Sequence, residues 1–176
     1  MSKNQHLSKV LIRPATSEDT LAVQAIRKKA WQARYANPES GVTKELLASS
    51  LAKLPPSSED IDHYHAMLAK PTNKNKNLVA TLDDEIIGTV CYDTLENGMG
   101  DIGVFVAEGF NGKGVGDKLL ESLKNKTDNT LQVIIFAKNP SREFYKKHGF
   151  VEVGREERHY FDRDTYLPTQ VLRLNR

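Results

Sequence analysis

The sequence contains a single cysteine, Cys91, among its 176 residues, so no disulfide can form within the chain. One free thiol suits a reducing compartment. No stretch approaches the ~18 consecutive apolar residues that cross a membrane. The first residues, MSKNQHLSKVLIRP, also lack the apolar core of a secretion signal. We therefore expect a cytoplasmic protein without a membrane partner.

The chain also has little net charge and no long run of one sign. Its formal charge is +2, from 25 basic and 23 acidic residues, which does not favour nucleic acid as a partner. No metal is expected, because His63 and His65 are spaced i,i+2 and would point to nearly opposite sides of a helix. The length fits one domain over residues 1–176, with residues 1–8 disordered.

Helical and strand patterns alternate along the chain. They predict an α+β fold with a mostly antiparallel sheet of about seven strands flanked by helices. One strand–helix–strand crossover, over residues 102–136, requires parallel or splayed strands. Helices are predicted over residues 16–35, 43–54, 58–70, 115–123 and 141–148, and strands over residues 9–15, 78–82, 86–93, 101–106, 131–137, 150–157 and 169–174.

Cap residues and apolar faces can be assigned for three of these helices. Thr16 or Ser17 is the expected N-cap of the first helix, and Ser141 that of the last. The buried faces are predicted from apolar residues at helical spacing. They are Leu21, Ala25, Ile26, Ala30 and Ala33 in the first helix, and Val115, Leu119, Leu120 and Leu123 in the helix over residues 115–123.

The stretch FNGKGVGDKLLESL, residues 110–123, places three glycines just before an amphipathic helix. It is not a Walker A loop, because that motif ends in Gly-Lys-Ser/Thr and Asp117 follows Gly116 here, and Gly116 comes one residue too early for a dinucleotide fingerprint. Free N–H groups and the helix dipole nevertheless make such a turn a ready anion site, to which Lys113 adds charge. A tight strand-to-helix connection without a ligand explains this stretch equally well.

A second stretch, NPSREFYKKHGFVEVG at residues 139–154, carries an aromatic pair into a turn and a strand. Together the two stretches resemble the GNAT superfamily of N-acetyltransferases. The family signature Gln/Arg-x-x-Gly-x-Gly/Ala is similar to residues 111–116, although Asn111 replaces the long donor. The later element Phe-Tyr-x-x-x-Gly-Phe is similar to residues 144–150. The resemblance covers roughly residues 10–174 and implies the GNAT fold with splayed central strands.

The resemblance implies acetyl-CoA as the cosubstrate, with its pyrophosphate on the glycine turn and its pantetheine arm along the strand over residues 101–106. In the family an Asn often stands seven residues before the tyrosine that matches Tyr145. Lys138 holds that position here and Asn139 follows it, so either could face the pantetheine. The residues implied to bind acetyl-CoA are Val104, Phe105, Val106, Asn111, Gly112, Lys113, Gly114, Val115, Gly116, Asn139, Ser141 and Tyr145.

The resemblance also implies direct attack of an amine on the thioester in a ternary complex. Tyr145 matches the family's general acid for the leaving sulfur, and a phenol with a pKa of ~10 is protonated at neutral pH. Asp101 is the candidate base for the amine, because some family members carry an acid there. A solvated strand-end acid is an equally good interpretation of Asp101, with a chain of waters acting as the base.

The acceptor is expected to be a primary amine of a small molecule or a protein, and the sequence does not choose among them. Trp31, Tyr35 and Tyr160 are candidate acceptor-binding residues, with Tyr64 and His159 beside them. A non-catalytic acyl-CoA sensor on the same fold is the alternative function, and an unrelated nucleotide-phosphate module is a third. Both a monomer and a homodimer are compatible with the sequence.

Overall fold

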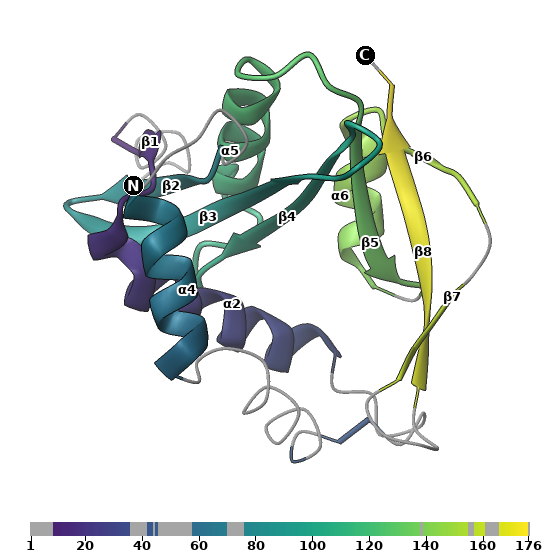
Figure 1. The fold of residues 1–176 in the computed structure, drawn as a ribbon, viewed down its shortest axis with the longest axis horizontal. Helices are drawn as coiled ribbons and strands as arrows, with labels where there is room; N and C mark the ends of the chain where they lie inside the picture. Colours follow the sequence, from purple (N-terminus) through teal and green to yellow (C-terminus); the bar gives the residue numbers. More distant parts are fainter. Residues whose placement is uncertain are drawn as a thin grey trace.

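The structure is a computed structural model and shows an α+β architecture built on one mixed β-sheet (Figure 1). It describes residues 9–35, 42–43, 45, 58–69, 76–137, 139–154, 157–160 and 166–175. The predicted disorder at the N-terminus and nearly all of the helix predicted over residues 43–54 lie outside these ranges.

Eight strands form the sheet in the described part of the chain, against about seven predicted. Their order is β1-β2-β3-β4-β5-β8-β6, and β7 pairs with β8. Every pairing is antiparallel except that of β4 with β5. The strands are β1 (Leu11–Pro14), β2 (Leu78–Leu82), β3 (Glu85–Thr94), β4 (Gly100–Val106), β5 (Leu131–Phe136), β6 (Val151–Glu152), β7 (Glu157–Tyr160) and β8 (Tyr166–Leu174).

The end of the chain differs from the prediction of two final strands. Three strands are present, because the predicted strand over residues 150–157 is divided into β6 and a separate β7. The segment REERHYFDRD around β7 is rich in charged residues and gives no alternating apolar signal. Its strand conformation comes from pairing with β8, from Glu157 opposite Thr169 to Tyr160 opposite Tyr166.

Strands β4 and β5 separate after a short contact, as the predicted splay requires. Their parallel register joins only Gly100 with Leu131 and Asp101 with Gln132. Beyond Asp101, β4 stays paired with β3 as far as Val106, whereas β5 stays paired with β8. The sheet therefore opens along β4 beyond Asp101, and the cavities described below lie at this opening.

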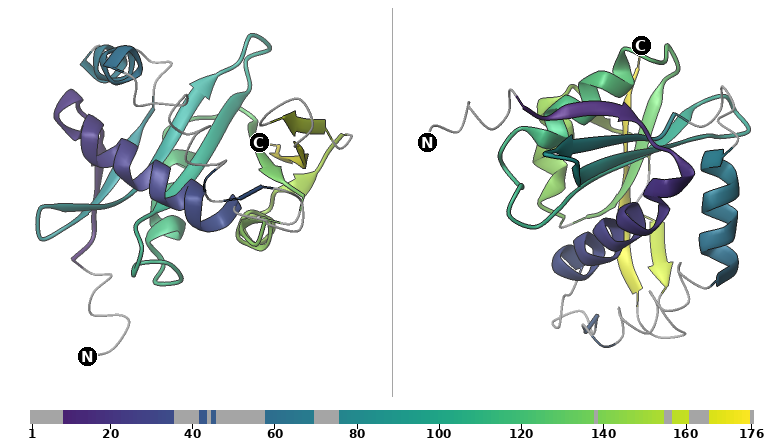
Figure 2. Two further views of the ribbon diagram at one scale, coloured as in Figure 1. Left: turned by 90° about the horizontal axis from the view of Figure 1, so that it is seen from below. Right: turned by 90° about the vertical axis from the view of Figure 1, so that its left-hand side faces the viewer.

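Helices cover both faces of the sheet. The 3₁₀ turn η1 (Ser17–Asp19) and the helices α2 (Thr20–Tyr35) and α4 (Ser58–Ala69) lie on one face, and α5 (Val115–Lys124) and α6 (Ser141–Lys147) lie on the other (Figure 2). Thr16 is the N-cap of η1 and forms a capping box with Asp19. Of the two predicted alternatives, Thr16 and Ser17, the structure thus has Thr16 as the cap. No described helix is long and apolar enough to span a membrane.

The predicted apolar face of α2 is wrong in part. Ile26 is buried as expected, but Leu21 is 67% exposed, and the most deeply buried side chain is Val23. Val23 packs with Tyr64 and Leu68 of α4 in a small cluster of buried side chains. The helix is thus oriented by its contacts with α4 and the sheet, which a pattern dominated by alanines could not indicate.

The predicted buried face of α5 is confirmed. Val115, Leu119, Leu120 and Leu123 are all buried, and they pack against the sheet in the larger of the two hydrophobic cores. The same core includes Tyr145 of α6. The core therefore fixes the glycine turn and the aromatic helix relative to each other.

Candidate active site

The glycine turn connects β4 to α5 through left-handed backbone conformations. Gly112 has φ +70° and Gly114 has φ +83°, a region that only glycine adopts without strain. Gly114 is the N-cap of α5, and no side chain caps the helix there. The first N–H groups of α5 therefore remain for another acceptor, at the positive end of the helix dipole.

A cavity of about 530 Å³, here called the glycine-turn cavity, lies between this turn and α6. Eight of the residues expected to bind acetyl-CoA line it. They are Val104, Val106, Asn111, Gly112, Gly114, Gly116, Ser141 and Tyr145. Phe110, Asp117, Pro140, Glu143, Phe144 and Lys147 also line it and were not predicted.

Four other residues expected to bind acetyl-CoA lie elsewhere. Val115 is buried in the core. Lys113 places its ammonium nitrogen 5.4 Å from the centre of the Phe110 ring. Phe105 and Asn139 line a second cavity. Strand alternation explains the position of Phe105, because its neighbours Val104 and Val106 point to the opposite face of β4.

The third glycine of the turn has a packing role. A Cβ atom on Gly116 would lie 3.3 Å from the Phe144 ring and 3.6 Å from a Val104 methyl group. A side chain here would crowd the Phe144 ring, so the absence of one lets α6 pack closely on the start of α5. Asp117, one residue further on, is held by Lys147 at 2.7 Å and by His148 at 2.9 Å. Its negative charge is thus balanced beside the turn.

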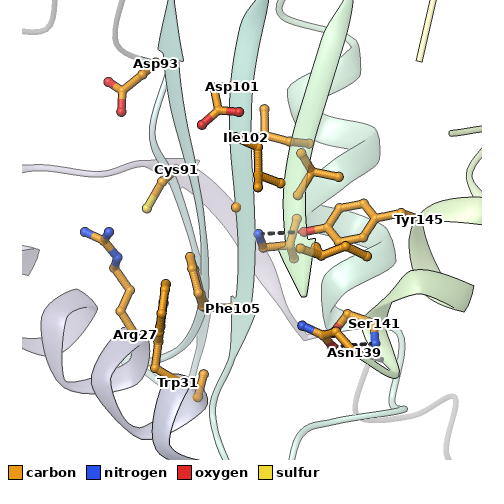
Figure 3. A pocket seen from close by; sticks show the side chains of 16 residues that line it. Arg27, Trp31, Cys91, Asp93, Asp101, Ile102, Phe105, Asn139, Ser141 and Tyr145 are labelled. Atoms are coloured by element: carbon orange, nitrogen blue, oxygen red, sulfur yellow. Dashed lines mark hydrogen bonds between the residues drawn. The ribbon is translucent and has the colours of Figure 1, made fainter. Parts of the chain in front are cut away.

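The second cavity, here called the splay cavity, has a volume of about 200 Å³ and lies where β4 and β5 separate (Figure 3). Helix α2 closes it from one side with Arg27, Ala30 and Trp31. The two cavities share Val104, Ser141 and Tyr145 in their linings. They therefore meet across the sheet at this point.

Tyr145 stands at the junction of the two cavities. Its side chain is 3% exposed, and its ring packs edge-on against Phe144 and Phe150, with centroid distances of 5.1 and 5.4 Å. The backbone N–H of Val104 donates a hydrogen bond to the Tyr145 hydroxyl over 3.2 Å (Figure 3). Packing therefore fixes the hydroxyl beside a backbone donor of the open part of β4.

Asp101 lines the splay cavity together with Gly103 and Phe105, because alternate residues of a strand lie on the same face. Burial raises the pKa of Asp101, the negative charge of Asp93 raises it further, and a hydrogen bond from Gln132 opposes both. Asp93 lies directly opposite Asp101 in the β3–β4 register. One carboxylate oxygen of Asp101 is buried and has no hydrogen-bond partner. These features suit a group that accepts a proton.

Asp101→Asn should lower kcat/KM by about 10²-fold if the carboxylate is the base, while leaving stability unchanged or higher. Because the pKa of Asp101 is raised, the acidic limb of the kcat/KM profile should lie above the usual aspartate range. Asp93→Asn removes a charge that raises this pKa, so it should move the limb to lower pH. Profiles of kcat/KM against pH for the three proteins test the assignment, and an unchanged limb in both variants would contradict it.

The segment before α6 differs in detail from the prediction. Pro140, not Ser141, is the N-cap residue of α6. The side-chain oxygen of Asn139 accepts a hydrogen bond from the Ser141 N–H over 2.8 Å, so Asn139 supplies the cap from one position further back. Asn139 lines the splay cavity. Lys138, the alternative contact for pantetheine, lies outside the described residues.

The candidate acceptor-binding residues lie in different places, and only some of their side chains are described. Trp31 lines the splay cavity and meets the Phe136 ring edge-on, with ring centres 6.0 Å apart. Tyr35 ends α2 and Tyr160 ends β7, but their side chains are outside what the structure describes. Tyr64 is buried, and its hydroxyl lies 3.8 Å from the Cys91 sulfur.

Cys91 lies on β3, is half-buried and lines the splay cavity. Sequence reasoning missed Arg27 and Asp93 in this lining. The sequence contains a feature that could have identified each of these two residues. Arg27 stands four residues before Trp31 on one helical face, and only a short segment separates the predicted strands over residues 86–93 and 101–106, at whose facing ends Asp93 and Asp101 stand. The described residues contain no cluster of side chains that could hold a metal ion.

Comparisons with known proteins agree with this architecture. Residues 73–152 match the family model described as acetyltransferase (GNAT) domain. An N-acetyltransferase from Staphylococcus aureus Mu50 superposes with a TM-score of 0.69, at 21% identity, over 94% of this chain and 98% of that one. No curated protein sequence matches the chain significantly.

Two further structures with the same fold were solved with ligands. A GNAT superfamily phosphinothricin acetyltransferase from Sinorhizobium meliloti, in complex with acetyl-CoA, has a TM-score of 0.70 at 18% identity, over 94% of this chain and 88% of that one. PaiA N-acetyltransferase from Thermoplasma acidophilum, in complex with coenzyme A, has a TM-score of 0.66 at 18% identity, over 91% and 97%.

Residues 73–152 thus match a GNAT acetyltransferase domain, and the chain shares its fold with solved acetyltransferases. The resemblance predicted from the glycine turn and the aromatic helix is thereby confirmed. The predicted fold class, an α+β GNAT fold with splayed central strands, is confirmed as well.

Proposed function

We propose that this protein transfers an acetyl group from acetyl-CoA to a primary amine by direct attack in a ternary complex, in the cytoplasm, as a single domain over residues 1–176. The observation that supports this proposal is the meeting of two cavities at Val104, Ser141 and Tyr145. One cavity is large enough for part of a long cosubstrate, and the other admits a small acceptor from the opposite side of the sheet.

The glycine-turn cavity fits the phosphate end of acetyl-CoA. The start of α5 has no side-chain cap, and a phosphate oxygen can accept hydrogen bonds from such free N–H groups. A Cβ on Gly112 would meet no atom within 4 Å, so the turn is open to a ligand. The pantetheine arm would then follow the unpaired edge of β4 past Val106 and Val104 toward Tyr145.

The chain's own groups at the junction have separate roles in the proposed reaction. The amine nitrogen bonds to the thioester carbon, the carbon–sulfur bond breaks, and the leaving sulfur takes the proton of the Tyr145 hydroxyl. The Val104 N–H, which donates to the Tyr145 hydroxyl in the structure, would turn to the thioester carbonyl oxygen and stabilise the charge that develops on it. The proton released by the amine passes to Asp101, directly or through water. Solvent then takes the proton from Asp101 and restores the proton of Tyr145, so both groups return to their starting states.

Calorimetric titration with acetyl-CoA, beside ATP and NAD, tests the proposal first. We expect acetyl-CoA alone to bind, and release of free CoA to depend on an added amine. Binding without any amine-dependent release would favour an acyl-CoA sensor on the same fold. Binding of ATP or NAD in place of acetyl-CoA would contradict both functions.

Gly114→Val should weaken acetyl-CoA binding by about tenfold or more, which corresponds to about 1.4 kcal/mol. The new side chain fills the space where a phosphate approaches the turn, and a branched residue is strained at φ +83°. Gly98→Val is the matched control, since Gly98 has φ +81° in the turn between β3 and β4 and lines neither cavity. Equal acetyl-CoA affinities in the two variants would contradict the assignment of the phosphate site.

A further inference from the structure

Arg27 brings a positive charge into the splay cavity from helix α2. It lines the cavity one helical turn before Trp31. Its guanidinium carbon lies 5.8 Å from the centre of the Tyr64 ring and 5.7 Å from the centre of the Phe105 ring. Two aromatic rings from α4 and β4 therefore hold the guanidinium in place.

Arg27 is not held by a carboxylate of the described chain. Arg13 is paired with Asp19 and Arg142 with Glu152, but none of the ion pairs among the described residues includes Arg27. A cation–π contact uses the charge of a guanidinium and leaves its N–H donors for other partners. These donors match a carboxylate, which accepts two parallel hydrogen bonds.

Carboxylates occupy the other end of the same cavity. Asp101 and Asp93 lie opposite each other on β4 and β3, and both line the cavity with Arg27 (Figure 3). Phe105, which contacts Arg27, follows Asp101 by four positions on the same face of β4. Gly103 lies between them and has no side chain. The cavity thus offers a donor for an anion at one end and acceptors for an ammonium group at the other.

The junction with the glycine-turn cavity lies between these two ends. Val104 and Tyr145 mark the junction. Val104 lies on β4 between Asp101 and Phe105, and Tyr145 lies on α6. The cavity volume of about 200 Å³ corresponds to roughly six or seven waters at ~30 Å³ each. A small molecule that carries an amine and a carboxylate close together fits this size and this arrangement of charges.

We propose that the acceptor is a small amino acid, and that Arg27 determines this specificity by binding its carboxylate while the amine is acetylated. This inference rests on the proposed function. A simple amine or polyamine would leave the guanidinium without an anion, and a cationic acceptor would be repelled by it.

Pairs of acceptors that differ only in the carboxylate test the proposal. The pairs are L-methionine with 3-(methylthio)propylamine, L-phenylalanine with phenethylamine, L-lysine with cadaverine, and L-alanine with ethylamine, each assayed by release of CoA. We expect the amino acid of at least one pair to exceed its amine by about 10²-fold or more in kcat/KM, since a site that binds a polar group rejects the analogue lacking it.

The variant Arg27→Met should remove this preference. The kcat/KM for the amino acid should fall by about 10²-fold, mainly through a higher KM, while the value for the amine changes little. Arg27→Lys should restore part of the preference, because it keeps the charge without the paired donors. Lys29→Met, an exposed change on the same helix, is the control and should leave the preference unchanged.

Three outcomes would overturn the inference. The amines could be used as well as the amino acids, Arg27→Met could lower both members of each pair by the same factor, or neither member of any pair could be acetylated. The calorimetric titration separates these results from failure of the proposed function. If acetyl-CoA binds and amines are acetylated as well as amino acids, only the proposed role of Arg27 is contradicted. If acetyl-CoA does not bind, the proposed function itself is contradicted, and the role of Arg27 with it.

Discussion

Replacing Tyr145 with phenylalanine should lower kcat by about 10²- to 10⁴-fold, the range that general acids contribute, with little change in acetyl-CoA affinity. The substitution keeps the ring, which packs against Phe144 and Phe150. It removes only the hydroxyl that lies 3.2 Å from the Val104 nitrogen. Because the proton is needed when the carbon–sulfur bond breaks, the loss should appear in the chemical step. Steady-state kinetics and calorimetric titration of the same preparation measure the two effects.

The matched control is Tyr92→Phe, which also removes a hydroxyl from a buried tyrosine. The Tyr92 hydroxyl accepts a hydrogen bond from the Asn129 side chain over 2.9 Å, and Tyr92 lines neither of the two cavities. We expect this variant to lose some stability and to keep its kcat. Full activity in Tyr145→Phe, or equal losses of kcat in both variants, would remove Tyr145 from the catalytic role.

The parts of the fold that sequence could predict depend on local patterns. The helix α5 has its buried residues at regular helical spacing after three glycines, so its start, its face and the preceding turn all follow from residues 110–123. The central strands are short apolar runs, which identify them without knowledge of their partners. The strand–helix–strand crossover over residues 102–136 predicted a parallel or splayed pair, and the resemblance to GNAT acetyltransferases implied that the central strands splay.

Other parts depend on contacts between distant residues. Gly116 leaves room for the Phe144 ring of α6, a contact that local sequence does not reveal. The buried side of α2 is set by Tyr64 and Leu68 of α4, and the same orientation brings Arg27 into the splay cavity. The strand β7 exists because β8 pairs with it. Residues that act through tertiary contacts were therefore the ones that sequence reasoning missed.

Asp19→Asn should have the largest effect on stability among the changes considered, a loss of about 2–3 kcal/mol, which is near the upper range for hydrogen bonds to a charged group. Asp19 is 6% exposed. It accepts two hydrogen bonds from Arg13, at 2.6 and 2.8 Å, and one from the Thr16 N–H at 2.7 Å. Asparagine keeps the shape but loses the charge and one acceptor oxygen. Urea unfolding at neutral pH measures the difference.

The effect should depend on pH in a defined direction. The hydrogen bonds from Arg13 are the main reason why the pKa of Asp19 lies below its usual value in the folded protein. Its contribution is therefore complete above the unfolded pKa of about 3.9 and is lost as the pH falls through the folded value. The stability difference between wild type and Asp19→Asn should shrink over this acidic range.

Glu18→Gln provides the control for this prediction, because Glu18 is an exposed acid in the same turn. We expect it to change stability little at any pH. If Asp19→Asn and Glu18→Gln gave the same small loss, the Arg13–Asp19 contact would be a surface ion pair of little consequence. A large loss confined to Asp19→Asn would instead show that this contact fixes the start of α2. The position of Arg27 and Trp31 in the splay cavity would then depend on a capping interaction two or more helical turns away from them.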